Sequence, residues 1–176
     1  MNIMLDLETL GTEVGSVILS IGAVAFSTIE GVLSDKAFYK VIDLQKSMDL
    51  GFTMSASTIK WWLAQDDKAR EAVSVKGSHP IEVLADFNDW VKDSRGIEIW
   101  GNDETFDICL LKAYYNKLTS VWPFKYSSNR CFRTLKRIAP LDTPLPATVC
   151  AHNAVEDAIW QARFALNSAN RLGVEL

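Results

Sequence analysis

Three apolar segments within the first 43 residues constrain the fold more than any other feature of this sequence. Residues 2–7 and 17–27 are typical of buried strands, and residues 35–43 alternate apolar and polar side chains as a half-buried strand does. Gly11 and Gly31 lie in the intervening turns. Because both connections are short, we expect the three strands to form an antiparallel meander.

Helical periodicity replaces the strand pattern after residue 44. We expect helices at residues 57–65, 66–73, 80–91, 105–118 and 153–170, and a further strand at residues 97–100. This order predicts an α/β fold in which helices cover a mixed sheet. Residues 139–149 contain three of the five prolines and are typical of a surface loop.

Length and composition favour a single globular domain over residues 1–176. A chain of this length can bury most of an apolar core without disulfides or structural metals. Cys109, Cys131 and Cys150 have no CxxC spacing, so we expect neither a disulfide framework nor a zinc site. No apolar run approaches the roughly 18 residues of a membrane span, and we expect a cytoplasmic protein.

The net charge of −4 disfavours a protein that binds duplex nucleic acid tightly and without sequence preference. It disfavours an enzyme with acidic metal ligands much less, because bound cations reverse the local sign of the charge. The arrangement of the acidic residues therefore carries more information than their total number.

Asp6 and Glu8 lie two residues apart in the first expected strand. Side chains alternate along a strand, so both carboxylates project from one face, while Leu5 and Leu7 project from the other. Two ionised carboxylates this close repel each other unless a cation lies between them. On this spacing alone, a strand end with two solvated acids explains the pattern equally well.

A second acidic position follows the strand at residues 97–100. Asp107 falls in the first turn of the next helix, near the sheet edge where open α/β sheets bind their ligands. Taken alone, it is also explained as an acid that complements the helix dipole.

His152 and Asp157 form the third candidate group. Inside one helix, residues five apart point about 140° away from each other and cannot serve one site. We therefore expect the last helix to begin just after His152. That helix carries a stripe of small residues that allows close approach to the sheet and moves Asp157 towards Asp6. The stripe consists of Ala154, Ala158, Ala162, Ala165 and Ala169. Alone, His152 is also consistent with an ordinary surface histidine.

Three short motifs together resemble those of one enzyme superfamily. They are DLET at residues 6–9, GNDETFD at 101–107 and HNAVEDA at 152–158. In order and spacing they are similar to the DEDDh 3′ to 5′ exonucleases, or DnaQ-like proteins, which include the proofreading subunit of DNA polymerase III, ribonuclease T and oligoribonuclease. The longer strings STIKWWL, WGNDETFDICLL and CFRTLK are similar to phage and prophage exonuclease VIII-like proteins and to small exoribonucleases.

The resemblance covers residues 2–167 and implies both a fold and a reaction. The fold is ribonuclease H-like, with a mixed five-stranded sheet whose first three strands are antiparallel and whose later strands are parallel. The reaction is metal-dependent hydrolysis of DNA or RNA from a free 3′ end, releasing nucleoside 5′-monophosphates. The expected partner is nucleic acid in single-stranded form, with a homodimer as one possible assembly, and the expected location is a bacterial cell or a phage-infected host.

The resemblance also assigns catalytic roles. Asp6, Glu8, Asp107 and Asp157 are expected to hold two Mg²⁺ or Mn²⁺ ions, with Asp6 shared by both ions and Asp107 acting through water. His152 is expected to be the general base that activates the attacking water.

Expected substrate contacts come from several segments. Thr9 and Leu10 are implied for the last nucleotide, Asn102 for its sugar, and Phe106 either stacks on a base or belongs to the core. Adjacent Trp61 and Trp62 point about 100° apart in a helix, and we expect both to pack in the core.

The basic residues near position 133 are candidates for a phosphate track. On a helix, Arg130, Arg133 and Arg137 would share one face. A solvated helix face is the alternative interpretation.

Two other functions remain open at this point. A ribonuclease H-like endonuclease shares the fold and the metals, although the HxxxxD spacing of His152 and Asp157 disfavours it. A catalytically silent nucleic-acid-binding module is disfavoured because all five expected active-site residues are present. The sequence does not distinguish RNA from DNA as the substrate.

Overall fold

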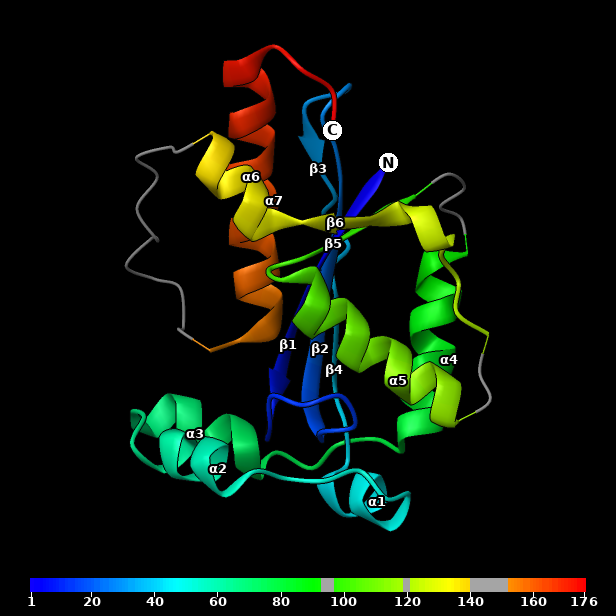
Figure 1. Cartoon of the computed structure of the whole chain (residues 1–176), viewed down its shortest axis with the longest axis vertical. Coiled ribbons are helices and arrows are strands. Elements are labelled where there is room, and N and C mark those ends of the chain that lie inside the picture. The colour runs from blue at the N-terminus through cyan, green and yellow to red at the C-terminus, as the bar shows by residue number, and fades with distance from the viewer. Residues whose placement is uncertain (93–96, 119–120, 140–151) are drawn as a thin grey trace.

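A mixed β-sheet forms the centre of the molecule (Figure 1). The computed structural model describes residues 1–92, 97–118, 121–139 and 152–176. The strands are β1 (Asn2–Thr9), β2 (Ile18–Ser27), β3 (Val32–Leu33), β4 (Phe38–Val41), β5 (Glu98–Gly101) and β6 (Asn129–Cys131). They run in the order β3-β2-β1-β5-β6, and β4 also pairs with β2. β2 is antiparallel to β1, β3 and β4, whereas β5 is parallel to β1 and β6.

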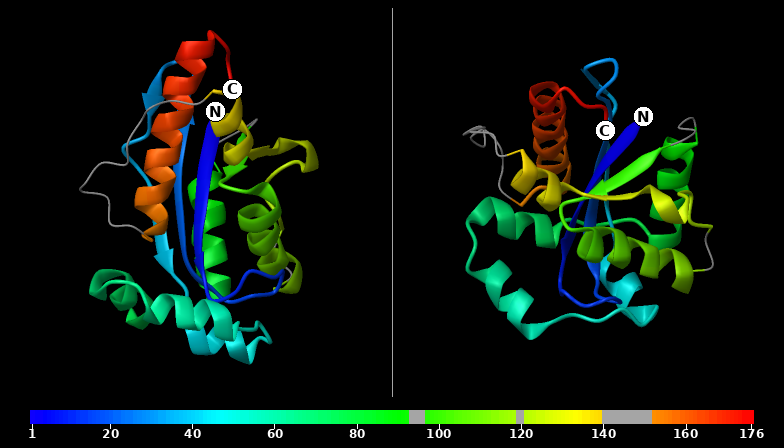
Figure 2. Two further views of the ribbon diagram at one scale, coloured as in Figure 1. Left: turned by 60° about the vertical axis from the view of Figure 1, so that its left-hand side comes forward. Right: turned by 45° about the horizontal axis from the view of Figure 1, so that its top comes forward.

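Helices cover both faces of the sheet. They are α1 (Leu44–Asp49), α2 (Ala56–Leu63), α3 (Asp67–Ser74), α4 (Pro80–Val91), α5 (Cys109–Lys117), α6 (Phe132–Ile138) and α7 (Ala154–Leu172), with a π-helical turn η1 (Glu104–Ile108) before α5 and a 3₁₀ turn η2 (Tyr126–Ser128). α4 and α5 lie on one side of the sheet and α7 lies on the other, while α1 to α3 gather beyond one end (Figures 1 and 2). Among the helices described, none is both long and apolar enough to cross a bilayer.

The predicted mixed sheet flanked by helices is confirmed, but the predicted number of five strands is wrong. A sixth strand, β3, consists of two residues that pair with the far end of β2. Two residues are too few to show an alternating pattern, so no sequence signal marks this strand. The predicted loop at residues 139–149 falls almost entirely outside the described residues.

The two faces of β1 serve different purposes. Ile3, Leu5 and Leu7 are buried in the core cluster that also contains residues of α4 and α5. Met4 belongs to the second core cluster, together with residues of α7. Because side chains alternate along a strand, Asp6 follows Met4 onto the face that α7 covers, and Glu8 follows Asp6. The predicted common face of the two carboxylates is confirmed.

Gly22 lets the first turn of α7 lie directly against the sheet. In the β1–β2 pairing, Gly22 lies opposite Asp6. A Cβ atom at this position would come within 2.1 Å of the carbonyl carbon of Ala154, so no other residue fits without moving the helix. The predicted small-residue stripe packs against the sheet, and its members Ala154, Ala158, Ala162, Ala165 and Ala169 are all buried. Backbone contact at Gly22 therefore fixes where α7 begins.

Candidate active site

The packing of α7 on the sheet brings four carboxylates to one cavity. Carboxylate oxygens of Asp6, Glu8 and Asp157 lie within 4.8 Å of one another. Asp107 lines the same cavity, which has a volume of about 340 Å³ and also contains His152. The structure thus brings together residues that are separated by up to 151 positions in the chain.

The start of α7 separates His152 from Asp157, as predicted from their spacing. Asn153 caps the helix, and its side-chain oxygen accepts hydrogen bonds from the backbone N–H groups of Val155 at 3.2 Å and Glu156 at 3.3 Å. His152 precedes the cap and has a left-handed backbone, with φ of 68°. This turn places the imidazole in the cavity that Asp157 enters from the first turn of the helix.

Asp107 reaches the cavity from η1. Asp103 caps this turn, and its backbone N–H donates a hydrogen bond of 3.1 Å to Oδ2 of Asp107. Gly101 at the end of β5 provides the space, because a Cβ atom there would lie 3.0 Å from the Cβ of Asp107. The short strand and the tight turn together hold Asp107 beside β1.

Burial and mutual repulsion make ionisation of this cluster unfavourable. Burial, followed by the charges of Asp157 and Asp107, raises the pKa of Glu8 to about 8. Burial raises the pKa of Asp107 to about 7, against hydrogen bonds from backbone N–H groups that lower it. Burial and the neighbouring carboxylates raise the pKa of Asp6 well above its ordinary range, and burial raises that of Asp157 as well.

The donor set fits a hard divalent cation. All four side chains offer carboxylate oxygens, which Mg²⁺ and Mn²⁺ prefer. In the part of the chain that the structure describes, none of the four forms an ion pair with lysine or arginine. Cations bound here would therefore offset a repulsion that the protein itself leaves uncompensated.

The comparisons with known proteins identify the family of this chain. The model of the Rv2179c-like 3′-5′ exoribonuclease domain matches residues 1–168. This chain belongs to that family. Family membership makes it a 3′-5′ exonuclease. Among curated proteins, no sequence match was found.

Solved structures share the fold of this exonuclease at low sequence identity. The nuclease domain of 3′hExo bound to rAMP has a TM-score of 0.64 at 15% identity, covering 99% of this chain and 94% of that one. Exonuclease X in complex with 5′ overhanging duplex DNA has a TM-score of 0.58 at 17% identity, covering 98% and 93%. E. coli Exonuclease I with a 5cy-dT13 oligonucleotide has a TM-score of 0.67 at 14% identity, covering 98% of this chain and 41% of that one. These similarities show the ribonuclease H-like fold.

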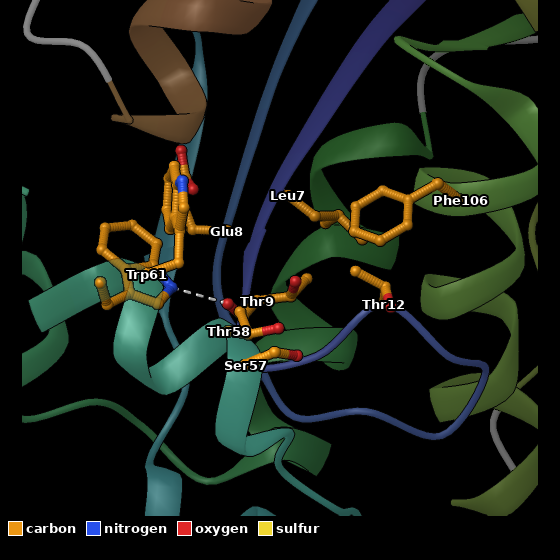
Figure 3. A pocket seen from close by; sticks show the side chains of 9 residues that line it. Leu7, Glu8, Thr9, Thr12, Ser57, Thr58, Trp61 and Phe106 are labelled. Atoms are coloured by element: carbon orange, nitrogen blue, oxygen red, sulfur yellow. Dashed lines mark hydrogen bonds between the residues drawn. The ribbon is translucent and has the colours of Figure 1, made fainter. Parts of the chain in front are cut away.

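A second pocket of the exonuclease adjoins the acidic cavity. It has a volume of about 470 Å³ and shares Leu7, Glu8 and Phe106 with the acidic cavity. Figure 3 shows Trp61 and Phe106 on opposite sides of this pocket. The hydroxyl side chains of Thr12, Ser57 and Thr58 line its remaining edge, together with Thr9 (Figure 3).

Trp61 and Trp62 occupy different environments, so the prediction that both belong to the core is wrong for Trp61. Trp62 is buried, and its Nε1–H donates a 2.9 Å hydrogen bond to the carbonyl oxygen of Thr9. Trp61 is 43% exposed, and its ring stands edge-to-face with that of His152 at 4.8 Å between centroids. The 100° between adjacent helical positions was the available signal that only one of them could be buried.

Of the other predicted substrate-binding residues, some line the acidic cavity and one does not. Asn102 and Arg133 line the acidic cavity, and Arg133 forms an ion pair with Asp103. Leu10 is not brought to either of these pockets, because it is buried in the core and lines a separate apolar cavity.

The predicted helix face of three arginines is wrong. Arg130 lies in β6, where its guanidinium forms an ion pair with Glu98, while Arg133 and Arg137 lie in α6. Arg137 is exposed and lines neither the acidic cavity nor the adjoining pocket. Only Arg133 of the three reaches the acidic cavity.

Gln161 is a polar residue of the site that the sequence analysis missed. It lines the acidic cavity and donates a 2.8 Å hydrogen bond from Nε2 to Oδ1 of Asp6. Its position four residues after Asp157, on the same helix face, was the signal that could have revealed it.

Proposed function

We propose that this exonuclease removes nucleotides from the 3′ end of single-stranded RNA, with two divalent ions in the acidic cavity and His152 as general base. The observation that carries this proposal is the shared wall between the four-carboxylate cavity and a pocket of about 470 Å³. That volume is within the range of pockets that bind small ligands. A terminal nucleotide bound in the pocket would present its phosphodiester bond to the carboxylates.

Asp6, Glu8 and Asp157 would hold one ion, and Asp6 with Asp107 would hold the other. When bound, such ions activate a water molecule and stabilise the charge that develops on the phosphate and on the leaving 3′ oxygen. The carboxylate oxygens of Asp6, Glu8 and Asp157 lie close together, which supports these three residues as ligands of the first ion. The Asp107 carboxylate is held by the backbone N–H of Asp103, which supports Asp107 as a ligand of the second ion.

His152 would accept the proton of the attacking water. Its imidazole lines the acidic cavity and lies just before the N-terminal end of α7, close to Asp157. Histidine is suited to this task because it exchanges protons near neutral pH. The rings of Trp61 and Trp62 pack against it and limit its rotation.

The adjoining pocket would bind the terminal nucleoside. Phe106 and Trp61 offer aromatic surfaces for the base, an interaction of about 1–3 kcal/mol per base. Arg133 and Asn102 line the acidic cavity and would contact the phosphate and the sugar.

The hydroxyl-lined edge of the pocket favours RNA. Thr12, Ser57 and Thr58 can donate to and accept from a ribose 2′-hydroxyl, which deoxyribose lacks. The family description as an exoribonuclease supports the same substrate.

A degradation ladder tests the proposal. RNA and DNA oligonucleotides of one sequence, labelled at the 5′ end, are incubated with the protein in Mg²⁺, in Mn²⁺ and in EDTA. We expect progressive shortening of RNA in either metal, slower shortening of DNA, and no products in EDTA or with Asp6→Asn. Faster cleavage of DNA would refute the RNA assignment, and internal cuts in a 3′-phosphate-blocked strand would indicate an endonuclease.

A further inference from the structure

Gln161 lies on the buried face of α7, where most of the other side chains are alanines. It is 4% exposed and lies in the buried face of the helix between Ala158 and Ala165, next to Ala162. One helical turn separates it from Asp157, so both side chains emerge on the same side of α7. A polar amide is therefore placed within the packed contact between helix and sheet.

The direction of the amide follows from the chemistry of its partner. Nε2 of Gln161 lies 2.8 Å from Oδ1 of Asp6, across the contact between α7 and β1. With cations bound in the cavity, Asp6 is ionised and its carboxylate only accepts hydrogen bonds, so the amide presents its NH₂ group to Asp6. The amide oxygen, Oε1, is then directed elsewhere.

Oε1 of Gln161 is buried and has no hydrogen-bond partner among the described residues. A buried amide oxygen without a partner destabilises a fold, and an apolar side chain of the same length would fill the space without that cost. Packing alone does not account for glutamine at this position. The cavity that Gln161 lines also contains the four carboxylates.

We propose that Gln161 is a positioning residue for Asp6: its NH₂ group holds one carboxylate oxygen in a fixed orientation towards the acidic cavity. The inference rests on the proposed metal-dependent function of that cavity. Residues that orient metal ligands typically change metal affinity by about 10–100-fold when they are replaced. Gln161 thereby extends the site by one helical turn beyond the motif that contains His152 and Asp157.

Binding of Mn²⁺ to the full chain, without nucleic acid, tests this role. Free Mn²⁺ is measured by electron paramagnetic resonance during titration of the native protein and of Gln161→Met, which keeps the length of the side chain but removes both polar groups. We expect the Mn²⁺ dissociation constant of Gln161→Met to rise about 10-fold or more. Nuclease activity of the variant should recover as Mn²⁺ is raised.

Ser168→Ala is the matched control. Ser168 is also fully buried in α7 with an unpartnered side-chain oxygen, but it lies seven residues, or about 10 Å, further along the helix. Its replacement should leave Mn²⁺ affinity unchanged. If Gln161→Met does not fold, Gln161→Asn serves instead, because its amide is one methylene too short to reach Asp6 in the same way.

The outcomes separate this inference from the proposed function. Equal Mn²⁺ affinity of the native protein and the Gln161 variants would overturn the positioning role while leaving the metal site intact. Absence of Mn²⁺ binding by the native protein would overturn the proposed function itself. An equal loss of affinity in Ser168→Ala would assign the effect to the packing of α7 and also overturn the role.

Discussion

Replacing Glu8 with glutamine should stabilise the metal-free protein and abolish its nuclease activity. The Glu8 carboxylate is buried, and its oxygen lies within 4.8 Å of those of Asp6 and Asp157. Burial, with the charges of Asp157 and Asp107, raises the pKa of Glu8 from its ordinary value of 4.5 to about 8. Glutamine keeps the shape of the side chain and removes the charge that causes the repulsion.

The size of the effect follows from the pKa of Glu8. A pKa that is higher in the folded state than in the unfolded state contributes stability below the unfolded pKa. That contribution is lost as the pH rises through the folded pKa. The loss therefore develops between pH 4.5 and about pH 8. One pKa unit corresponds to about 1.4 kcal/mol, which sets an upper limit of about 5 kcal/mol. Because neighbouring carboxyl groups share the repulsion and can take up protons instead, we expect about 2–3 kcal/mol.

Urea denaturation in EDTA measures this effect. The native protein and Glu8→Gln are compared at about pH 5.5, 7 and 8.5, with the exposed Glu13→Gln as the control for loss of one negative charge. All three proteins should lose stability as the pH rises, and Glu8→Gln should lose about 2–3 kcal/mol less than the other two, because Asp6 and Asp107 keep their raised pKa values. Added Mn²⁺ should stabilise the native protein most at high pH, because the ion replaces the protons.

Two results would refute this reasoning. One is a native stability that does not change between about pH 5.5 and 8.5 in EDTA, which would mean that ionisation of the buried carboxylates does not destabilise the fold. The other is a Glu8→Gln protein that is less stable than the native one at the highest pH.

Three further predictions concern the residues around the acidic cavity. His152→Gly should lose activity and recover part of it in added imidazole, because glycine adopts the left-handed backbone without strain; rates that do not depend on imidazole would argue against a base at this position. Trp61→Ala should lower kcat about 10-fold, because it removes the ring contact with His152. Leu63→Ala, at an exposed position on the same helix, should change kcat less than about two-fold. Equal effects of the two substitutions would contradict a role of Trp61 in positioning His152. Arg133→Ala should raise KM for RNA and reduce the slope of log KM against log salt by about 1. Arg130→Ala should lower the melting temperature without changing KM, because its guanidinium pairs with Glu98. The reverse pattern would place the phosphate path along β6.

The sequence was sufficient to predict those features of the site that depend on the regular geometry of a single strand or helix. The period of two along β1 was sufficient to place Asp6 and Glu8 on one face, because this rule needs no tertiary information. If His152 and Asp157 both lay in one helix, their side chains would point about 140° apart. This was sufficient to predict that α7 begins between them. Both predictions use only the geometry of a single element.

Tertiary contacts account for what the sequence did not reveal. Gln161 belongs to the site only because α7 crosses β1 beside Asp6, and its own segment resembles an ordinary amphipathic helix. Arg130 was misplaced because the pairing with β5 draws residues 129–131 into the sheet, although their sequence is compatible with a helix. Short elements whose conformation depends on a neighbour leave little trace in their own sequence.

The close contact at Gly22 has a consequence for how this exonuclease tolerates mutation. In a scan of every position, residues that lack reactive side chains usually accept many substitutions. Position 22 should instead accept almost none, because any side chain would push α7, and with it Asp157, away from Asp6. Loss of activity should therefore map as strongly to this chemically inert residue as to the carboxylates themselves. The substitutions that this enzyme tolerates are then limited by the space between the backbones of β2 and α7 as well as by its ionisable groups.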